Sequence, residues 1–106
     1  MITLCDNSDH PEATYSILTL GASRVEGAAP EYFSFRYKLW ENLIENDWSV
    51  DFIGTQCDDY NYDSSVVIDR NHEGRGGWTS GQINNRIETW LNNLPQTDIV
   101  LFSSPG

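Results

Sequence analysis

Residues 15–27 read YSILTLGASRVEG and place a short apolar run directly before a glycine and a serine. Tyr15–Leu20 has the length and composition of a buried β-strand, and Gly21 stands where such a strand would end in a turn. A serine in that turn, Ser23, would be exposed, close to backbone N–H groups and held on a rigid support, as a nucleophilic hydroxyl requires. The same pattern also fits an ordinary glycine turn, so it needs support from elsewhere in the chain.

The apolar pattern predicts four further elements: a helix over 32–46, a strand over 48–55, a helix over 79–94 that Pro95 ends, and a nearly all-apolar strand over 98–103. We treat residues 1–14 as a polar leader and residues 15–106 as the folded part. The alternating order predicts an α/β fold in which helices cover a parallel sheet. A strand as apolar as 98–103 is expected to be covered on both faces.

The long segment 56–76 is rich in Asp, Asn, Ser and Gly, which predicts a functional loop. Ligands of open parallel sheets bind outside the carboxyl ends of the strands. That edge would carry Gly21–Ser23, Thr55–Cys57 and Ser103–Gly106.

Composition limits the classes of partner. The net charge of -10 over 106 residues would repel phosphate backbones, so we expect no nucleic-acid partner. The acidic residues are scattered, as in a solubilising surface, and neutral esters or sugars are easier ligands than anions. No run is apolar enough for a membrane span. We expect no cofactor or metal and a secreted or periplasmic location, whereas the pairing of Cys5 with Cys57 stays open.

A second candidate motif, HEGRGGWTS, occupies residues 72–80. Glycine allows a backbone N–H to approach a tetrahedral oxyanion closely, and one such donor contributes roughly 3 kcal/mol to a transition state. The alternative is a plain glycine turn packed by Trp78.

Together, ILTLGASRVEG and HEGRGGWTSGQI resemble the first two conserved blocks of the SGNH (GDSL-like) serine hydrolases, in the acetyl-xylan-esterase-like carbohydrate esterase group. The intervening FRYKLWENLIENDWSVDFIGTQ resembles the helix and second strand of that group, so the similarity runs from Tyr15 to Gly106. It implies the N-terminal part of a three-layer, flavodoxin-like SGNH hydrolase fold with a parallel sheet.

The resemblance implies that Ser23 is the nucleophile and that the N–H groups of Ser23 and Gly77 donate to the oxyanion. The family's third donor, an Asn, and its Asp-x-x-His have no counterpart in this sequence. We therefore expect a companion polypeptide to carry the C-terminal half, and this chain alone to be inactive. Ala22 departs from the family pattern, because it stands where an Asp usually fixes the nucleophile turn.

Two residues beside the motifs, Arg24 and Trp78, are candidate substrate contacts. Ion pairing is the stronger interpretation for the arginines, with Glu26 and Glu73 as the acidic neighbours of Arg24 and Arg75. The other tryptophans and the histidines have no predicted catalytic role. Trp40 and Trp90 are predicted core residues, and neither His10 nor His72 is expected to act as the base.

The resulting hypothesis is a serine esterase that hydrolyses acyl esters through Ser23. The resemblance of the second block suggests acetyl as the acyl group and acetylated carbohydrate as the substrate class. The alternative is a non-catalytic carbohydrate-binding or interaction module that keeps the fold. A nucleotide-binding protein is a weaker interpretation, because the turn after the first strand lacks GxGxxG.

Overall fold

The computed structural model describes residues 12–27, 34–58 and 69–103. Most of the predicted polar leader and the first residues of the helix predicted over 32–46 lie outside these ranges. The elements in chain order are β1 (Tyr15–Gly21), α1 (Ser23–Glu26), α2 (Arg36–Glu45), β2 (Val50–Ile53), β3 (Gln56–Cys57), β4 (Asn71–Gly74), α3 (Ser80–Asn84), α4 (Ile87–Asn92) and β5 (Ile99–Ser103).

The central strand is β1, and three strands pair with it in parallel. Its first half pairs with β2, from Tyr15↔Val50 onward, and its last residues pair with β4 through Gly21↔Gly74. On the other side it pairs with β5 over five positions that end at Gly21↔Ser103. The predicted parallel arrangement of the three main strands is confirmed.

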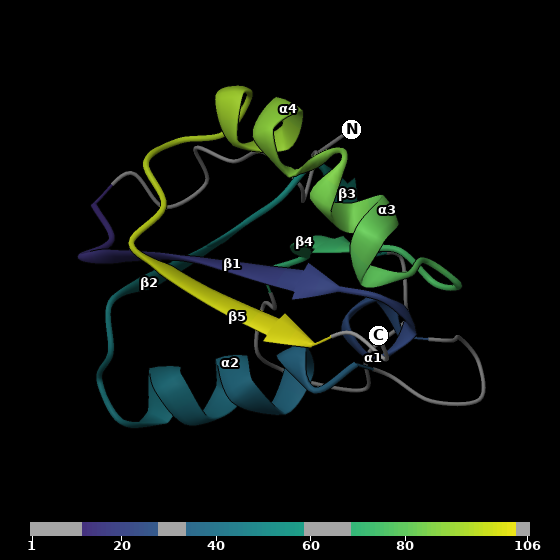
Figure 1. The fold of residues 1–106 in the computed structure, drawn as a ribbon. Coiled ribbons are helices and arrows are strands. Elements are labelled where there is room, and N and C mark those ends of the chain that lie inside the picture. Colours follow the sequence, from purple (N-terminus) through teal and green to yellow (C-terminus); the bar gives the residue numbers. More distant parts are fainter. Residues whose placement is uncertain (1–11, 28–33, 59–68, 104–106) are drawn as a thin grey trace, which may run out of the picture.

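Helices cover both faces of the sheet, as predicted (Figure 1). On one face α2 packs through Tyr37 and Trp40 against Ile17 of β1 and Phe52 of β2. On the other face α3 and α4 pack against a second cluster of buried side chains: Leu18, Leu20, Ile53, Ile83 and Trp90. The described fold is therefore a three-layer α/β arrangement, and the predicted core positions of Trp40 and Trp90 are confirmed.

The segment predicted as one long loop contains two strands. β3 and β4 form a short antiparallel pair, with Gln56 opposite His72. All four residues of β4 are buried although their sequence, NHEG, is polar. An apolar pattern could not reveal this strand, because its side chains are stabilised by hydrogen bonds instead of by apolar packing.

The helix predicted over 79–94 is divided into α3 and α4. Thr79 is the N-cap and forms a capping box with Gln82. The division falls at Asn85 and Arg86, which cap the end of α3 and the start of α4. The apolar residues keep the same helical spacing through both helices, so this spacing does not reveal the break between them.

Contrary to the expectation for β5, its faces are not both covered in the described structure. Val100 is 50% exposed and Phe102 is 55% exposed. β5 is the last strand on its side of β1, and its apolar side chains lack a further layer to pack against within the described residues.

Candidate active site

The turn after β1 presents Ser23 at the surface. Ala22 is buried, and its N–H donates to the Ser103 carbonyl of β5 at 3.2 Å. The Ala22 carbonyl in turn accepts the N–H groups of Val25 and Glu26, both at 3.1 Å, which starts α1. Ser23 is the first residue of that helix and is exposed. The hydroxyl thus lies at the carboxyl end of β1, where the sequence predicted it.

The glycine-rich turn lies directly beside this serine. A Cβ atom built on Gly76 would be 3.9 Å from the Ser23 Cβ. The Gly76 N–H donates to Oε2 of Glu26 on α1 at 2.8 Å. The two motifs, about 50 positions apart in sequence, therefore meet in space, which is the arrangement that an oxyanion hole requires.

Gly77 has a backbone conformation suited to glycine. Its φ is +83°, in the left-handed region, and no atom lies within 4 Å of the place where a Cβ would be. The residue is exposed, and among the described residues no hydrogen bond engages its N–H. An open space thus borders the amide predicted to donate to the oxyanion.

Strand β4 holds this turn against β1 and α1. The Arg75 N–H donates to the Gly21 carbonyl at 2.9 Å, and the Trp78 N–H donates to the Arg75 carbonyl at 3.2 Å. Gly74 passes so close to α1 that an added Cβ would lie 2.4 Å from the Glu26 nitrogen. Only a residue without a side chain permits that approach.

The side chain of Arg75 stabilises the same turn. Its Nη2 pairs with Oε2 of the fully buried Glu73 at 2.6 Å, so the predicted Arg75–Glu73 pair is confirmed. The guanidinium carbon also lies 4.2 Å from the ring centroid of Trp90 and 5.4 Å from that of Trp78. Trp78 is half-buried and packs against the second core cluster, so part of its ring supports the turn. A substrate contact by its exposed part stays a prediction.

Arg24 lies next to Ser23 and is exposed. It forms no ion pair with Glu26, whose carboxylate instead accepts the Gly76 N–H. Within the described ranges its guanidinium has no acidic partner, and its role as a substrate contact likewise stays a prediction.

His72 has a structural role. The side chain is buried in β4, and its Nδ1 accepts the Gly74 N–H at 3.0 Å. Burial, reinforced by the positive charge of Arg36, lowers the pKa of His72 from 6.5 to about 3, with Asp58 acting in the opposite direction. A buried, weakly basic imidazole whose Nδ1 is occupied is a poor base for Ser23. His10, the other histidine, lies outside the described residues.

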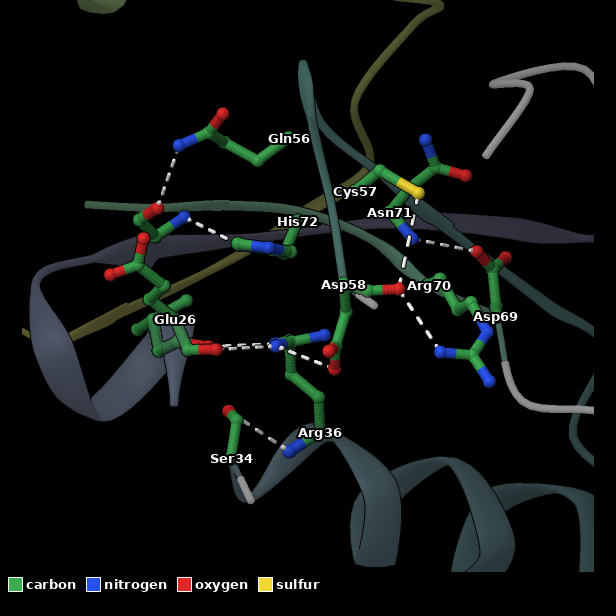
Figure 2. Close-up of polar contacts among 12 residues, drawn as sticks. Glu26, Ser34, Arg36, Gln56, Cys57, Asp58, Asp69, Arg70, Asn71 and His72 are labelled. Carbon is green, nitrogen blue, oxygen red and sulfur yellow. Dashed lines mark hydrogen bonds and ion pairs between the residues drawn. The ribbon is translucent and has the colours of Figure 1, made fainter. Parts of the chain in front are cut away.

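One residue of the site, Arg36, was not predicted from the sequence. It is fully buried in the first turn of α2, and its Nε and Nη2 donate to the carbonyls of Val25 and Glu26 at 2.7 and 2.9 Å (Figure 2). Nη2 also pairs with Asp58 Oδ2 at 3.1 Å. A signal was present in the sequence: Arg36 precedes Trp40 and Leu43 at helical spacing and so occupies the apolar face of its helix.

Cys57 forms a disulfide bond, and Cys5, the other cysteine of the sequence, lies outside the described ranges. No group of three or more potential metal ligands occurs among the residues that the structure describes. None of the helices in this part of the chain has the length and hydropathy of a membrane span.

Solved carbohydrate esterases have a similar fold. The family 3 carbohydrate esterase of Clostridium thermocellum matches with a TM-score of 0.70 and 35% identity, over 83% of this chain and 42% of that one. A family 3 carbohydrate esterase from Talaromyces cellulolyticus gives a TM-score of 0.70 and 31% identity, over 84% and 42%. The chain has the N-terminal part of an SGNH hydrolase fold.

A third solved structure matches over a similar share of both chains. A mutant acetyl esterase with an acetate ion matches this chain with a TM-score of 0.72 and 29% identity, over 86% of this chain and 43% of that one. The chain thus spans less than half the length of these esterases. No protein-family model and no curated protein matches its sequence.

Proposed function

We propose that this chain contributes the nucleophile and part of the oxyanion hole to an esterase that hydrolyses acyl esters, with acetylated carbohydrates as the substrate class. The proposal depends above all on one observation, the position of the exposed Ser23 beside Gly76, on which an added Cβ would lie 3.9 Å from the Ser23 Cβ. The similarity to two carbohydrate esterases and an acetyl esterase supports the choice of substrate.

In the proposed reaction the Ser23 oxygen attacks the acyl carbon of the ester. The serine proton passes to a base and then to the departing alcohol, which leaves an acyl-serine that water hydrolyses to the carboxylic acid. The N–H groups of Ser23 and Gly77 donate to the oxyanion that forms in each step. Each such donor contributes about 3 kcal/mol when it is aimed at the developing charge.

We propose further that a companion polypeptide segment supplies the base and the third oxyanion donor, an Asn in the family pattern. The segment would pack against β5, where Val100 and Phe102 are exposed. A pocket of about 400 Å³ beside that strand is lined by Leu20, Ile83, Ile87 and Phe102, among others. An apolar edge of this kind favours coverage by further chain.

Mass spectrometry of an active preparation from the native source tests the companion segment. We expect either a second fragment or a longer chain that contains this sequence. An active sample that consists of a single 12.1 kDa species would refute this part of the proposal.

Replacing the nucleophile tests the reaction. Ser23→Ala in the complete protein should abolish hydrolysis of p-nitrophenyl acetate and of acetylated xylo-oligosaccharides. Ser80→Ala, which changes a serine in the neighbouring helix α3, should retain the activity. Full activity of Ser23→Ala would exclude the mechanism.

A carbohydrate-binding or interaction module is the second candidate, because Ala22 stands where the family usually has an Asp. It requires sugar affinity without turnover, which calorimetry with deacetylated and acetylated oligosaccharides would detect. We also propose a secreted or periplasmic location, which the disulfide at Cys57 supports because disulfides persist in oxidising compartments.

A further inference from the structure

The nucleophile helix and the glycine-rich turn are joined by one side chain. Glu26 lies one helical turn after Ser23 in α1, and its Oε2 accepts the Gly76 N–H at 2.8 Å. Gly76 immediately precedes Gly77. Two successive glycines have more backbone freedom than any other pair of residues, so this turn needs an external contact to hold one conformation.

The backbone of Glu26 is fixed by hydrogen bonds from a buried arginine. The buried Arg36 donates to the Glu26 carbonyl at 2.9 Å and to the Val25 carbonyl at 2.7 Å. Asp58 pairs with the same guanidinium at 3.1 Å (Figure 2). An arginine with these three partners has little freedom to move, so the end of α1 is a fixed support for the carboxylate that it carries.

These contacts form a continuous connection from the core to the turn. Arg36 fixes the main chain of Glu26, the Glu26 carboxylate fixes the Gly76 amide, and the Gly76 peptide sets the direction of the next N–H, that of Gly77. Ser23 is carried by the same short helix. The connection therefore limits the positions that the turn can take relative to the serine.

We propose that Glu26 is a positioning residue, which holds the Gly77 N–H in register with Ser23 through the Gly76 amide. This inference rests on the proposed function, since it assigns Glu26 a role in the same oxyanion hole. Glu26 does not serve as the base here, because its carboxylate is hydrogen-bonded to the turn. Over the described ranges no hydrogen bond joins that carboxylate to the Ser23 hydroxyl.

Kinetics of Glu26 variants in the complete protein test the proposal, with p-nitrophenyl acetate as the substrate. Glu26→Ala removes the acceptor, so we expect kcat to fall at least about tenfold with KM nearly unchanged, because one misaligned oxyanion donor acts mainly on the transition state. Glu26→Gln keeps a side-chain oxygen that can accept the Gly76 N–H and should restore most of kcat. Glu41→Ala is the control, because the Glu41 carboxylate pairs with Lys38 within α2, and this variant should have no effect.

A second readout does not depend on activity. In amide NMR spectra of the ¹⁵N-labelled protein, the Gly76 proton bonded to a carboxylate should resonate downfield. It should move upfield in Glu26→Gln, because a neutral oxygen is a weaker acceptor than a charged one. The Gly77 resonance should broaden or split in Glu26→Ala as the turn gains conformations, whereas Glu41→Ala should leave both resonances in place.

The outcomes separate the two proposals. If Ser23→Ala is inactive but Glu26→Ala keeps the wild-type kcat, the positioning role is wrong and the esterase mechanism stands. Unchanged Gly76 and Gly77 resonances in both Glu26 variants would also overturn it, even if Glu26→Ala proved too unstable for kinetics. If Ser23→Ala remains active, the proposed function itself fails.

Discussion

At the residue scale, the predicted oxyanion donor depends on a conformation that favours glycine. Gly77 has a φ of +83°, and a left-handed conformation costs a residue with a side chain roughly 1–2 kcal/mol. Space is not the obstacle, because nothing lies within 4 Å of the position of its Cβ. A substitution there should therefore alter the direction of the amide and leave the core intact.

We predict that Gly77→Ala lowers kcat at least about tenfold, since the loss of one oxyanion donor costs about a hundredfold or more when it is complete. The free energy of unfolding should fall by only about 1 kcal/mol. Steady-state kinetics and urea unfolding of the same samples measure both effects. Gly81→Ala in α3 is the control, because its Cβ would meet only Thr79 Oγ1 at an ordinary 3.8 Å. Equal kcat values for the two variants would contradict the role of Gly77.

The buried imidazole of His72 predicts a dependence of stability on pH. Burial lowers its pKa to about 3 in the folded protein, against an ordinary value of 6.5. Between these values the unfolded chain binds the extra proton, so the free energy of unfolding falls as the pH drops below about 6.5. At pH 5 the loss from this group is about 2 kcal/mol.

Urea unfolding at about pH 7.5 and about pH 5 measures this effect. His72→Asn offers an oxygen to the Gly74 N–H without a group that titrates in this range, so its stability should change less between the two pH values than that of the wild type. His10 is present in both proteins, so its contribution to the pH dependence is the same in each. The same pH dependence in both would show that His72 titrates normally when folded.

At the element scale, the strands and helices with apolar periods were predictable and the polar elements were not. β1, β2 and β5 follow from runs such as ILTL and IVLF, and α2 follows from its apolar spacing. β4 was missed because its buried side chains are polar and are stabilised by hydrogen bonds to particular residues. Glu73, for example, accepts hydrogen bonds from Thr55 and Arg75. Such partners come largely from distant parts of the chain, so no local pattern reports them.

Likewise, the site was predictable only where a motif marks it. Ser23 and Gly77 follow from the resemblance to two conserved blocks, and the structure places their segments side by side. The resemblance did not reveal Arg36, whose function is to hold the carbonyls at the end of α1. Its partners there are backbone carbonyls, which every residue has, so a sequence motif cannot identify them.

The close packing of β4 against α1 gives a prediction about these elements. In Gly74→Ala the new Cβ would meet the backbone at 2.4 Å from the Glu26 nitrogen and 2.8 Å from the Val25 carbon, so α1 must move. We expect a loss of about 1–3 kcal/mol in stability, as for other overpacked sites. Activity measured well below the thermal midpoint should fall as well, because α1 carries Ser23. A thermal midpoint equal to that of the wild type would show that α1 is not fixed against β4.

At the scale of the whole molecule, the sheet is asymmetric. β1 is buried between β2 and β5, and helices cover both of its faces, whereas β5 leaves Val100 and Phe102 exposed. Both side chains belong to a parallel strand that the sequence alone predicted to be covered. This chain spans about 42% of the family 3 carbohydrate esterases it matches, and the companion segment proposed above would pack at this edge.

An uncovered apolar edge strand also predicts how this polypeptide behaves when it is produced by itself. Exposed edges pair with other chains, and each apolar side chain that becomes buried contributes about 1.5–3 kcal/mol. We therefore expect the 106-residue chain to self-associate and to bind the dye ANS, and we expect Val100→Lys combined with Phe102→Glu to suppress both without lowering the thermal midpoint. Trp48→Lys is the matched control, because Trp48 is 51% exposed but lies outside β5, and that variant should still associate. Sedimentation velocity distinguishes the cases: association that persists in the double variant would place the contact elsewhere, and the companion segment would then lack its proposed docking edge.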